Sequence, residues 1–176
     1  VLTEGYNKNV FWEKFQNQTF VFHDRQISEK YSSVKSDNTK GIQMLVDYLY
    51  NLNHRQIAFA GYTPAAKSCE ERKQAYVFAL EEKGLNVHSE YIFHGELVSK
   101  TGAYAFDYFC SLANRPTAIV CANDQIARGF ITRANKIGMK VPDDFSVVGF
   151  DGCNPEYFYP RITTIRQDID LIAQKL

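Results

Sequence analysis

Three polar residues stand where short apolar runs end or where helices begin, and their side chains could bind a ligand rich in hydroxyl groups. Asn123 follows the apolar run 118–122, and Asp151 follows the run 145–150. Arg72 lies in the first turn of the helix predicted after another such run. Carboxylate and amide oxygens accept hydrogen bonds from hydroxyls, whereas a guanidinium donates two parallel ones. These residue types predict a binding site for a polyhydroxylated small molecule.

Each of these residues also has a purely structural interpretation. Asn123, or Asp124 beside it, can cap the helix that follows. Arg72 can be a solvated helix residue, and Asp151 can close a turn. Because the carboxyl ends of parallel strands meet at one edge of a sheet, the joint occurrence of three polar groups there favours a binding site over unrelated caps.

Arrangements suited to catalysis are missing from the sequence. The motifs Gly-x-Ser-x-Gly and Gly-x-Gly-x-x-Gly and the Walker loop do not occur. His54 is predicted to cap a helix end, and the pair Asp143-Asp144 is interpreted as a solvated turn rather than a metal site. The four histidines are scattered along the chain: His23, His54, His88 and His94. We therefore predict a protein that is not an enzyme and that holds no cofactor and no metal, with an α/β enzyme as the least favoured alternative.

The composition excludes further classes of protein. Lys and Arg together number 20, as do Asp and Glu, so the formal net charge is zero. A balanced charge argues against a surface that grips a phosphate backbone, and no apolar run approaches the roughly 20 residues of a membrane span. The four cysteines form no Cys-x-x-Cys pair and no secretory signal opens the chain, which predicts free thiols and a cytoplasmic location.

Short apolar runs alternate with amphipathic stretches along the whole chain. The predicted strands are 19–22, 32–35, 56–61, 91–93, 118–122, 145–150 and 162–165. The predicted helices are 9–15, 39–52, 69–83, 102–112, 124–137 and 169–176. Such alternation predicts an α/β fold with doubly wound parallel sheets, in which ligands bind outside the carboxyl ends of the strands.

Several strings occur in an order and spacing that resemble one protein family. They are Leu-x-His-Arg-x-Ile-Ala at 52–58, Glu-Arg-x-x-Ala-Tyr at 71–76, Arg-Pro-Thr-Ala-Ile-Val-Cys-Ala-Asn-Asp-Gln-Ile-Ala at 115–127, Val-Pro-Asp-Asp-Phe-Ser-Val-Val-Gly-Phe-Asp at 141–151 and Pro-Arg-Ile-Thr-Thr-Ile at 160–165. In this combination the chain resembles the effector-binding core of the lac-repressor/purine-repressor family of bacterial transcription regulators. The likeness extends from about residue 20 to the end of the sequence.

The resemblance implies a two-lobed, periplasmic-binding-protein-like fold whose first lobe is incomplete in this chain. By this comparison, residues 1–54 and 167–176 form part of the N-terminal lobe, and residues 55–166 form most of the C-terminal lobe. The family's helix-turn-helix segment, which docks in the DNA major groove, is absent from the 176 residues. The resemblance thus implies a core truncated at both ends, a piece of a longer regulator.

The resemblance also implies which residues hold the effector. Leu97 stands where the family often places an aromatic ring for stacking on the ligand. Gln167 and Ile169 fall where the chain re-enters the first lobe and lines the cleft. The implied ligand-binding set is Ser68, Arg72, Leu97, Asn123, Asp151, Gln167 and Ile169.

The function implied by the resemblance is that of the effector-sensing domain of a transcriptional repressor, which binds a small sugar or sugar-like metabolite between two lobes. Its expected partners are the effector, a second copy of the chain and, only through the missing N-terminal segment, operator DNA; no membrane is involved. The aromatic-rich helix 102–112 predicts the homodimer independently, because it carries more apolar surface than one buried face needs. The alternative is a secreted sugar-binding receptor of a transport system, since such receptors share the fold.

Overall fold

The computed structural model describes residues 19–24, 31–64, 66–153 and 158–176. The helix predicted at 9–15 lies outside the described residues. The chain divides into two compact units, of which one comprises Val1–Lys35 and Ile169–Leu176 and the other comprises Ser36–Asp168. We call them the small unit and the large unit and describe each by itself.

The described residues of the small unit include a short parallel ladder and a helix. Strands β1 (Val21–His23) and β2 (Ser32–Val34) pair in parallel, and helix α6 spans Ile169–Lys175. The rings of Phe20 and Phe22 stack with their centroids 6.1 Å apart, and Tyr31 meets both rings edge-on. The two strands begin and end within about two residues of their predicted positions.

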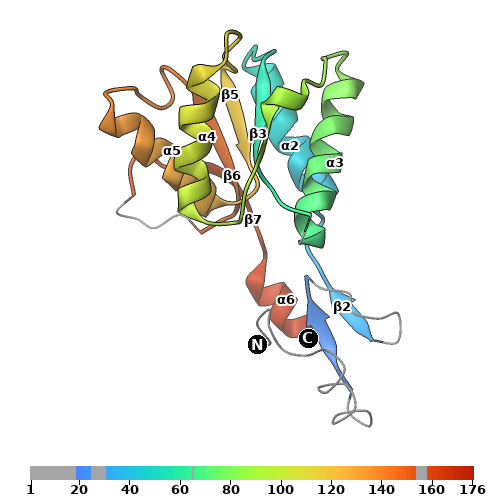
Figure 1. Ribbon diagram of the computed structural model, residues 1–176. Helices are drawn as coiled ribbons and strands as arrows, with labels where there is room; N and C mark the ends of the chain where they lie inside the picture. The colour runs from blue at the N-terminus through green and yellow to red at the C-terminus, as the bar shows by residue number, and fades with distance from the viewer. Residues whose placement is uncertain (1–18, 25–30, 65, 154–157) are drawn as a thin grey trace. The chain divides into compact units, whose positions relative to one another are not determined.

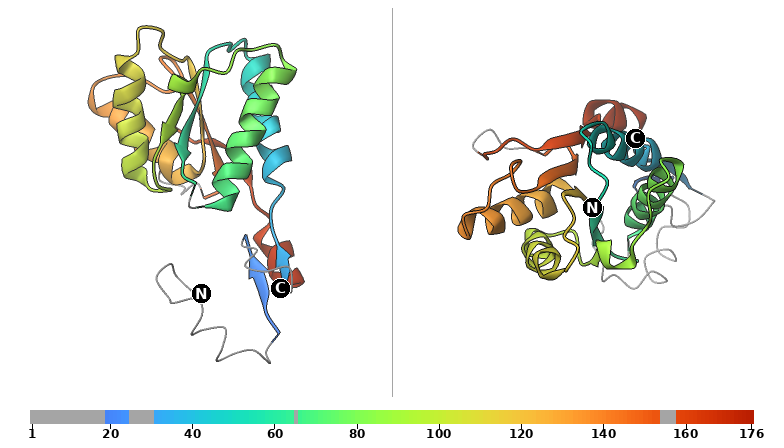
Figure 2. Two further views of the ribbon diagram at one scale, coloured as in Figure 1. Left: turned by 45° about the vertical axis from the view of Figure 1, so that its right-hand side comes forward. Right: turned by 90° about the horizontal axis from the view of Figure 1, so that it is seen from above.

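The large unit is built around a parallel sheet with two helices on each face. Its strands are β3 (Ile57–Tyr62), β4 (Ile92–His94), β5 (Ala118–Cys121), β6 (Ser146–Asp151) and β7 (Thr163–Arg166). Its helices are α2 (Asn38–Asn51), α3 (Lys67–Glu82), α4 (Ser99–Ser111) and α5 (Asp124–Lys136), with a short 3₁₀ turn, η1 (Ser89–Tyr91). Helices α2 and α3 cover one face of the sheet, and α4 and α5 cover the other (Figures 1 and 2). The predicted doubly wound α/β fold with parallel strands is confirmed.

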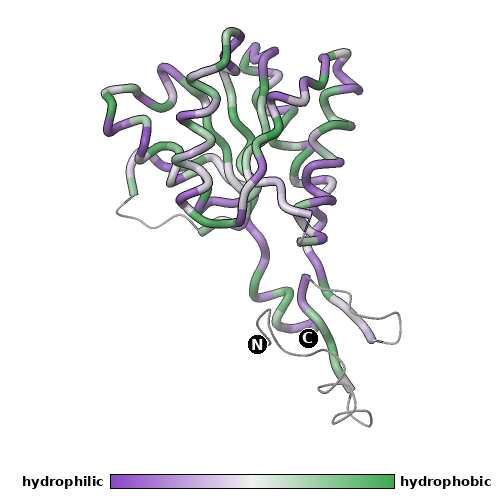
Figure 3. The backbone as a smooth tube through the Cα atoms, viewed as in Figure 1, coloured by the Kyte–Doolittle hydropathy of each residue, from purple (hydrophilic) through white to green (hydrophobic). Residues whose placement is uncertain are grey.

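The strand order of this sheet is β4-β3-β5-β6-β7, with every pair parallel. After β3 the chain winds to one side to form β4 and then returns to the other side to form β5. In such sheets the crevice between β3 and β5, at their carboxyl ends, is where ligands bind. Strand β5 is buried along its whole length, as its continuously apolar sequence predicts, and hydrophobic residues run along the central strands (Figure 3).

The boundary between the two units differs from the predicted one. The sequence placed residues 1–54 in the first lobe, but the large unit begins at Ser36 and therefore includes α2. The reason is packing: a Cβ on Gly41 of α2 would lie 2.6 Å from the ring of Phe150 in β6 and 3.3 Å from Ile165 in β7. Helix α2 thus rests directly on the sheet, which a one-dimensional pattern does not reveal. That the two units correspond to parts of the two lobes stays a prediction.

The aromatic residues of α4 are divided between core and surface. Phe106 and Phe109 are buried, and the ring of Phe106 packs edge-on against the rings of Phe130 and Phe145. Tyr104, in contrast, is 54% exposed. Most of the aromatic surface that suggested a dimer contact therefore belongs to the core of the large unit.

Asp124 fastens the start of α5 to the two strands beyond it. Its side chain is 1% exposed, and its carboxylate accepts hydrogen bonds from the Thr164 hydroxyl at 2.6 Å and from the Cys153 backbone N–H at 2.6 Å. A side chain at Gly149 would overlap Asp124 Oδ1, so glycine is needed on the adjacent strand. Burial raises the pKa of the Asp124 carboxyl above its usual value, although both hydrogen bonds act in the opposite direction.

Helices α4 and α5 approach so closely that two positions require glycine. A Cβ on Gly102 would overlap the carbonyl oxygen of Ile126, and a Cβ on Gly129 would overlap that of Ser99. We expect Gly102→Ala to lower the free energy of unfolding by about 3 kcal/mol in urea denaturation, because the packed helices must separate. The higher helix propensity of alanine alone predicts the opposite sign, a gain of about 1 kcal/mol. The exposed substitution Gln125→Ala on α5 is the control; a stabilised Gly102→Ala would contradict the packing described.

A second prediction concerns the pH dependence of stability. Because the folded protein binds a proton at Asp124 more tightly than the unfolded chain does, this carboxyl favours the folded state most below its unfolded pKa of about 3.9. That contribution is lost as the pH rises through the folded pKa, by at most about 1.4 kcal/mol per pH unit. The unfolding free energy of the wild type should therefore fall relative to that of Asp124→Asn as the pH rises. Asp143→Asn, in an exposed turn, controls for removing one negative charge; parallel curves for wild type and Asp124→Asn would refute the effect.

Candidate functional site

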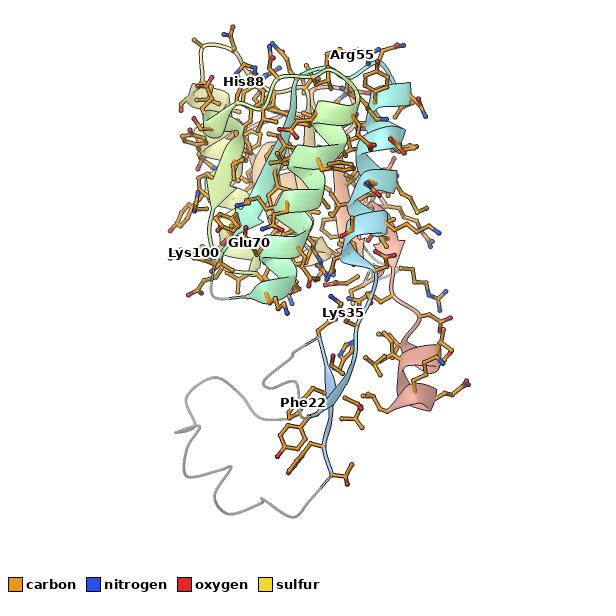
Figure 4. All side chains as sticks on the ribbon, turned by 90° about the vertical axis from the view of Figure 1, so that its right-hand side faces the viewer. Phe22, Lys35, Arg55, Glu70, His88 and Lys100 are labelled. Atoms are coloured by element: carbon orange, nitrogen blue, oxygen red, sulfur yellow. The ribbon has the colours of Figure 1, made fainter. Side chains whose placement is uncertain are left out.

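The carboxyl edge of the large sheet collects nearly all the predicted site residues. Each of its five strands is followed by at least one of them: Ser68 and Arg72 after β3, Leu97 after β4, Asn123 after β5, Asp151 at the end of β6 and Gln167 after β7. Figure 4 shows the two edges by their labelled residues: Arg55 and His88 precede β3 and β4 at one end, whereas Glu70 and Lys100 lie at the other. The site thus lies at the end of a parallel sheet where ligands bind.

Arg72 is the most deeply held of these residues. It is 3% exposed and lies in the second turn of α3, because that helix begins at Lys67, two residues earlier than predicted. Its Nε donates to Asn38 Oδ1 at 2.8 Å, and one terminal nitrogen donates to the Ala122 carbonyl at 2.5 Å. The guanidinium carbon lies 3.7 Å from the centre of the Phe150 ring, a cation–π contact. The interpretation of Arg72 as a solvated helix residue is therefore wrong.

Asp151 lies beside Arg72 with its carboxylate partly exposed. Its Oδ1 is 3.5 Å from the terminal nitrogen of Arg72 and accepts a hydrogen bond from Gln167 Nε2 at 2.7 Å. The backbone of Asp151 has a φ of +113°, which is uncommon for a residue with a side chain. A strained backbone of this kind persists only where the surrounding contacts hold it. We therefore infer that the contacts around Asp151 hold it in one orientation.

Asn123 caps α5 and also reaches the neighbouring loop. Its Oδ1 accepts from the Ile126 N–H at 2.9 Å, and its Nδ2 donates to the Leu97 carbonyl at 3.2 Å. The capping interpretation of Asn123 is thus confirmed, and its role toward a ligand stays a prediction. Leu97 is partly buried against the core of the large unit. The two predicted residues are brought together, with the amide of Asn123 anchoring the loop that carries Leu97.

The remaining two predicted residues are less closely connected. Ser68 is partly buried in the first turn of α3. Ile169 begins α6 in the small unit, where it is 59% exposed. The structure therefore joins Arg72, Asp151 and Gln167 in one hydrogen-bonded group, whereas Ile169 belongs to the other unit.

Sequence reasoning missed the residues that hold this group from the side of α2. Asn38 is buried, accepts from Arg72 through Oδ1, and donates from Nδ2 to Glu71 Oε2 at 2.8 Å. Ser36 donates from its hydroxyl to Gln167 Oε1 at 2.6 Å. In the sequence, Ser36-Asp37-Asn38 is a capping signal, and Asp37 indeed caps α2 by accepting from the Lys40 N–H. That signal gave no indication of the contacts to Arg72 and Gln167, because they depend on where α2 packs.

The arrangement provides hydrogen-bond donors and acceptors side by side. A guanidinium, a carboxylate and a side-chain amide offer donors and acceptors to adjacent hydroxyl groups of a ligand. Among the described residues, no cluster of three or more His, Cys, Asp or Glu side chains could hold a metal ion. No helix in the described part of the chain is long and apolar enough to cross a membrane.

His54 lies at the opposite edge of the sheet, where it both closes the end of α2 and joins two strands. Its backbone N–H donates to the Leu49 carbonyl of α2 at 3.1 Å. Its Nδ1 is 2.8 Å from the Thr117 hydroxyl and its Nε2 is 2.9 Å from the Ser146 hydroxyl. Partial burial lowers the pKa of its imidazole. The predicted role of His54 at the helix end is therefore confirmed for its backbone, and its ring adds a bridge between the starts of β5 and β6.

A hollow with a basic lining lies along α4 and α5, away from the group formed by Arg72, Asp151 and Gln167. It encloses about 580 Å³ and is lined by Ser99, Lys100, Ala103, Arg128, Gly129, Thr132, Arg133, Lys136 and Phe158. Two of its cations already have partners, since Arg133 Nε donates to Asp107 Oδ1 at 2.8 Å and Arg128 donates to the Cys153 carbonyl at 2.9 Å. The sequence, in which acidic and basic residues are interspersed, did not predict this local concentration of positive charge.

Comparison with known proteins shows which family has this architecture. Residues 46–176 match the family described as periplasmic binding protein-like domain. A probable HTH-type transcriptional repressor, ExuR of Bacillus subtilis, is 31% identical over 97% of this chain and 53% of its own length. The HTH-type transcriptional repressor CytR of Escherichia coli is 35% identical over 77% of this chain and 40% of its own. The chain thus spans about half the length of the curated relatives it matches.

Solved structures agree with these relatives. A regulatory protein of LacI family from Chloroflexus aggregans superposes with a TM-score of 0.84 at 29% identity, covering 97% of this chain and 62% of that one. A putative transcriptional regulator LacI from Bacillus cereus gives a TM-score of 0.85 at 27% identity, with the same coverage of the two chains. The chain therefore belongs to the periplasmic binding protein-like domain family, in the form that LacI-family regulators share.

Proposed function

We propose that this chain is the effector-sensing domain of a transcriptional repressor and that it binds a small sugar or sugar-like metabolite. The observation that carries the proposal is the group formed by Arg72, Asp151 and Gln167 at the carboxyl edge of the sheet, beside its switch point. The relatives named above are repressors, which favours a cytoplasmic regulator over a secreted receptor of a transport system. They also favour ligand binding over catalysis.

The class of ligand follows from the chemistry of the group. Several donors and acceptors lie close together, as recognition of adjacent hydroxyl groups requires. One similar solved protein is a transcriptional regulator, CelR, in complex with cellobiose; it is 25% identical to this chain, with a TM-score of 0.80. The aliphatic side chain of Leu97 offers an apolar surface but no aromatic ring for stacking. We therefore propose a ligand held mainly through hydroxyl groups.

The proposed mechanism is a shift between conformations of the complete regulator. A ligand can change the occupancy of an operator only through its different affinity for the DNA-bound and free conformations. We place operator recognition outside these 176 residues, since their net charge is zero and counterion release rewards a concentrated basic surface. The basic hollow on α4 and α5 is partly neutralised by Asp107, so it does not alter this proposal.

A ligand panel tests the proposal. We expect at least one compound among D-glucose, D-galactose, D-glucuronate and cellobiose, but not hypoxanthine, which carries no sugar hydroxyl groups, to raise the melting temperature of the chain, because a ligand that binds only the folded state stabilises it. Asp151→Asn should weaken binding of that compound about tenfold or more in calorimetry, since a hydrogen bond to a charged group is worth about 1.5–3 kcal/mol. Asp170→Asn, at the exposed start of α6, is the matched control. Unchanged affinity in Asp151→Asn would remove this residue from the site.

We also propose that two copies of the chain pair through the side of the large unit formed by α4 and α5. Tyr104 of α4 is 54% exposed, and Tyr159, which is 86% exposed, follows Phe158, a residue that lines the hollow on α4 and α5. We expect a dimer in sedimentation at about 10 μM, and we expect Tyr104→Glu with Tyr159→Glu to give monomers because charges in an apolar contact are not compensated. Tyr48→Glu, on the exposed side of α2, should leave the dimer intact. A monomeric wild-type chain would contradict this proposal.

A further inference from the structure

The backbone crosses between the two units twice, and a hydrogen bond joins the two crossings. The first crossing is the peptide between Lys35 and Ser36, and the second is that between Asp168 and Ile169. Ser36 and Gln167 stand at or next to these points, both on the side of the large unit. The Ser36 hydroxyl donates to Gln167 Oε1 at 2.6 Å, although 131 positions separate the two residues.

This bond fixes which end of the Gln167 amide faces the site. A hydroxyl that donates to the amide must meet its oxygen, which leaves the nitrogen of Gln167 on the side of Asp151. Gln167 Nε2 accordingly donates to Asp151 Oδ1 at 2.7 Å, and the Gln167 backbone N–H donates to the Asp151 carbonyl at 3.3 Å. Both the side chain and the backbone of Asp151 thus accept hydrogen bonds from Gln167, which lies next to the second crossing.

The segment at the first crossing also contacts Arg72, which pairs with Asp151. Two residues after Ser36, the buried Asn38 accepts from Arg72 Nε at 2.8 Å and is held in turn by Glu71. The three residues 36–38 therefore contact Arg72 directly and Asp151 through Gln167.

We propose that Ser36 is a positioning residue that orients Asp151 through Gln167 and thereby couples the binding site to both crossings between the units. A ligand that engages Asp151 meets a carboxylate that Gln167 already holds in one orientation. Because Gln167 also bonds to Ser36, occupancy of the site acts on both crossing segments. This coupling rests on the proposed function, whereas the orientation of Asp151 by Ser36 does not.

The orientation is tested without any ligand by NMR on the complete 176-residue chain. The side-chain amide of Gln167, identified by its absence in Gln167→Met, is followed through its proton exchange with water. In Ser36→Ala and Ser36→Cys, which lack a strong donor, we expect exchange about tenfold faster and a shift of the Asp151 carboxyl carbon resonance, because the loss of one such bond corresponds to about a factor of ten. Ser36→Thr should restore wild-type values. Thr39→Ala, at an exposed position in the first turn of α2, is the control.

The outcomes separate this proposal from a purely structural role and from the proposed function. A structural role for Ser36 predicts a lower melting temperature with the Gln167 amide and Asp151 carbon signals unchanged, and that result in both donor-free variants overturns the proposal. If D-glucose, cellobiose and the other panel compounds all fail to bind, the proposed function is contradicted, but the exchange measurement still decides the role of Ser36. If one of them binds, its affinity should fall about tenfold in Ser36→Ala and return in Ser36→Thr.

Discussion

The burial of one guanidinium constrains the centre of the large unit. Arg72 is almost completely removed from water, and an ion in that position is tolerated only when its donors find partners. Those partners come from three different elements: Asn38 of α2, the carbonyl after β5, and the end of β6 with Asp151 and the Phe150 ring. Leaving a buried donor without its partner typically costs about 1–3 kcal/mol, so α2, β5 and β6 must be correctly placed around the same charge.

A second buried charge plays a comparable part on the other side of β6. Asp124 connects the first turn of α5 to the backbone after β6 and to Thr164 of β7. Between these two fixed points the last residue of β6, Asp151, is held with an unusual backbone conformation and a partly exposed carboxylate. The large unit thus has a frame of buried polar contacts, and the partly exposed carboxylate of Asp151 lies at the edge of the sheet where ligands of this fold class bind.

Several residues of this protein both cap a helix and make contacts at the proposed binding site. Asn123 caps α5 and anchors the loop with Leu97, and the segment that begins α2 both caps that helix and contacts the ion pair. A site built in this way from the ends of strands and helices is held by the same hydrogen bonds that terminate those elements. Its geometry therefore depends on the correct termination of each element.

The sequence by itself determined the elements and the edge at which the site lies. Apolar periodicity gave every described strand and helix to within a few residues, and Arg72, Asn123 and Asp151 were found because polar residues after buried strands must gather at one edge. Only the tertiary structure decided that Arg72 is buried, that α2 belongs to the large unit, that Phe106 and Phe109 are core, and that Ser36 and Asn38 support the site. Periodicity along a chain specifies which face of an element is apolar. Which elements meet across that face depends on contacts between residues up to 131 positions apart, and these arise only when the sheet is assembled.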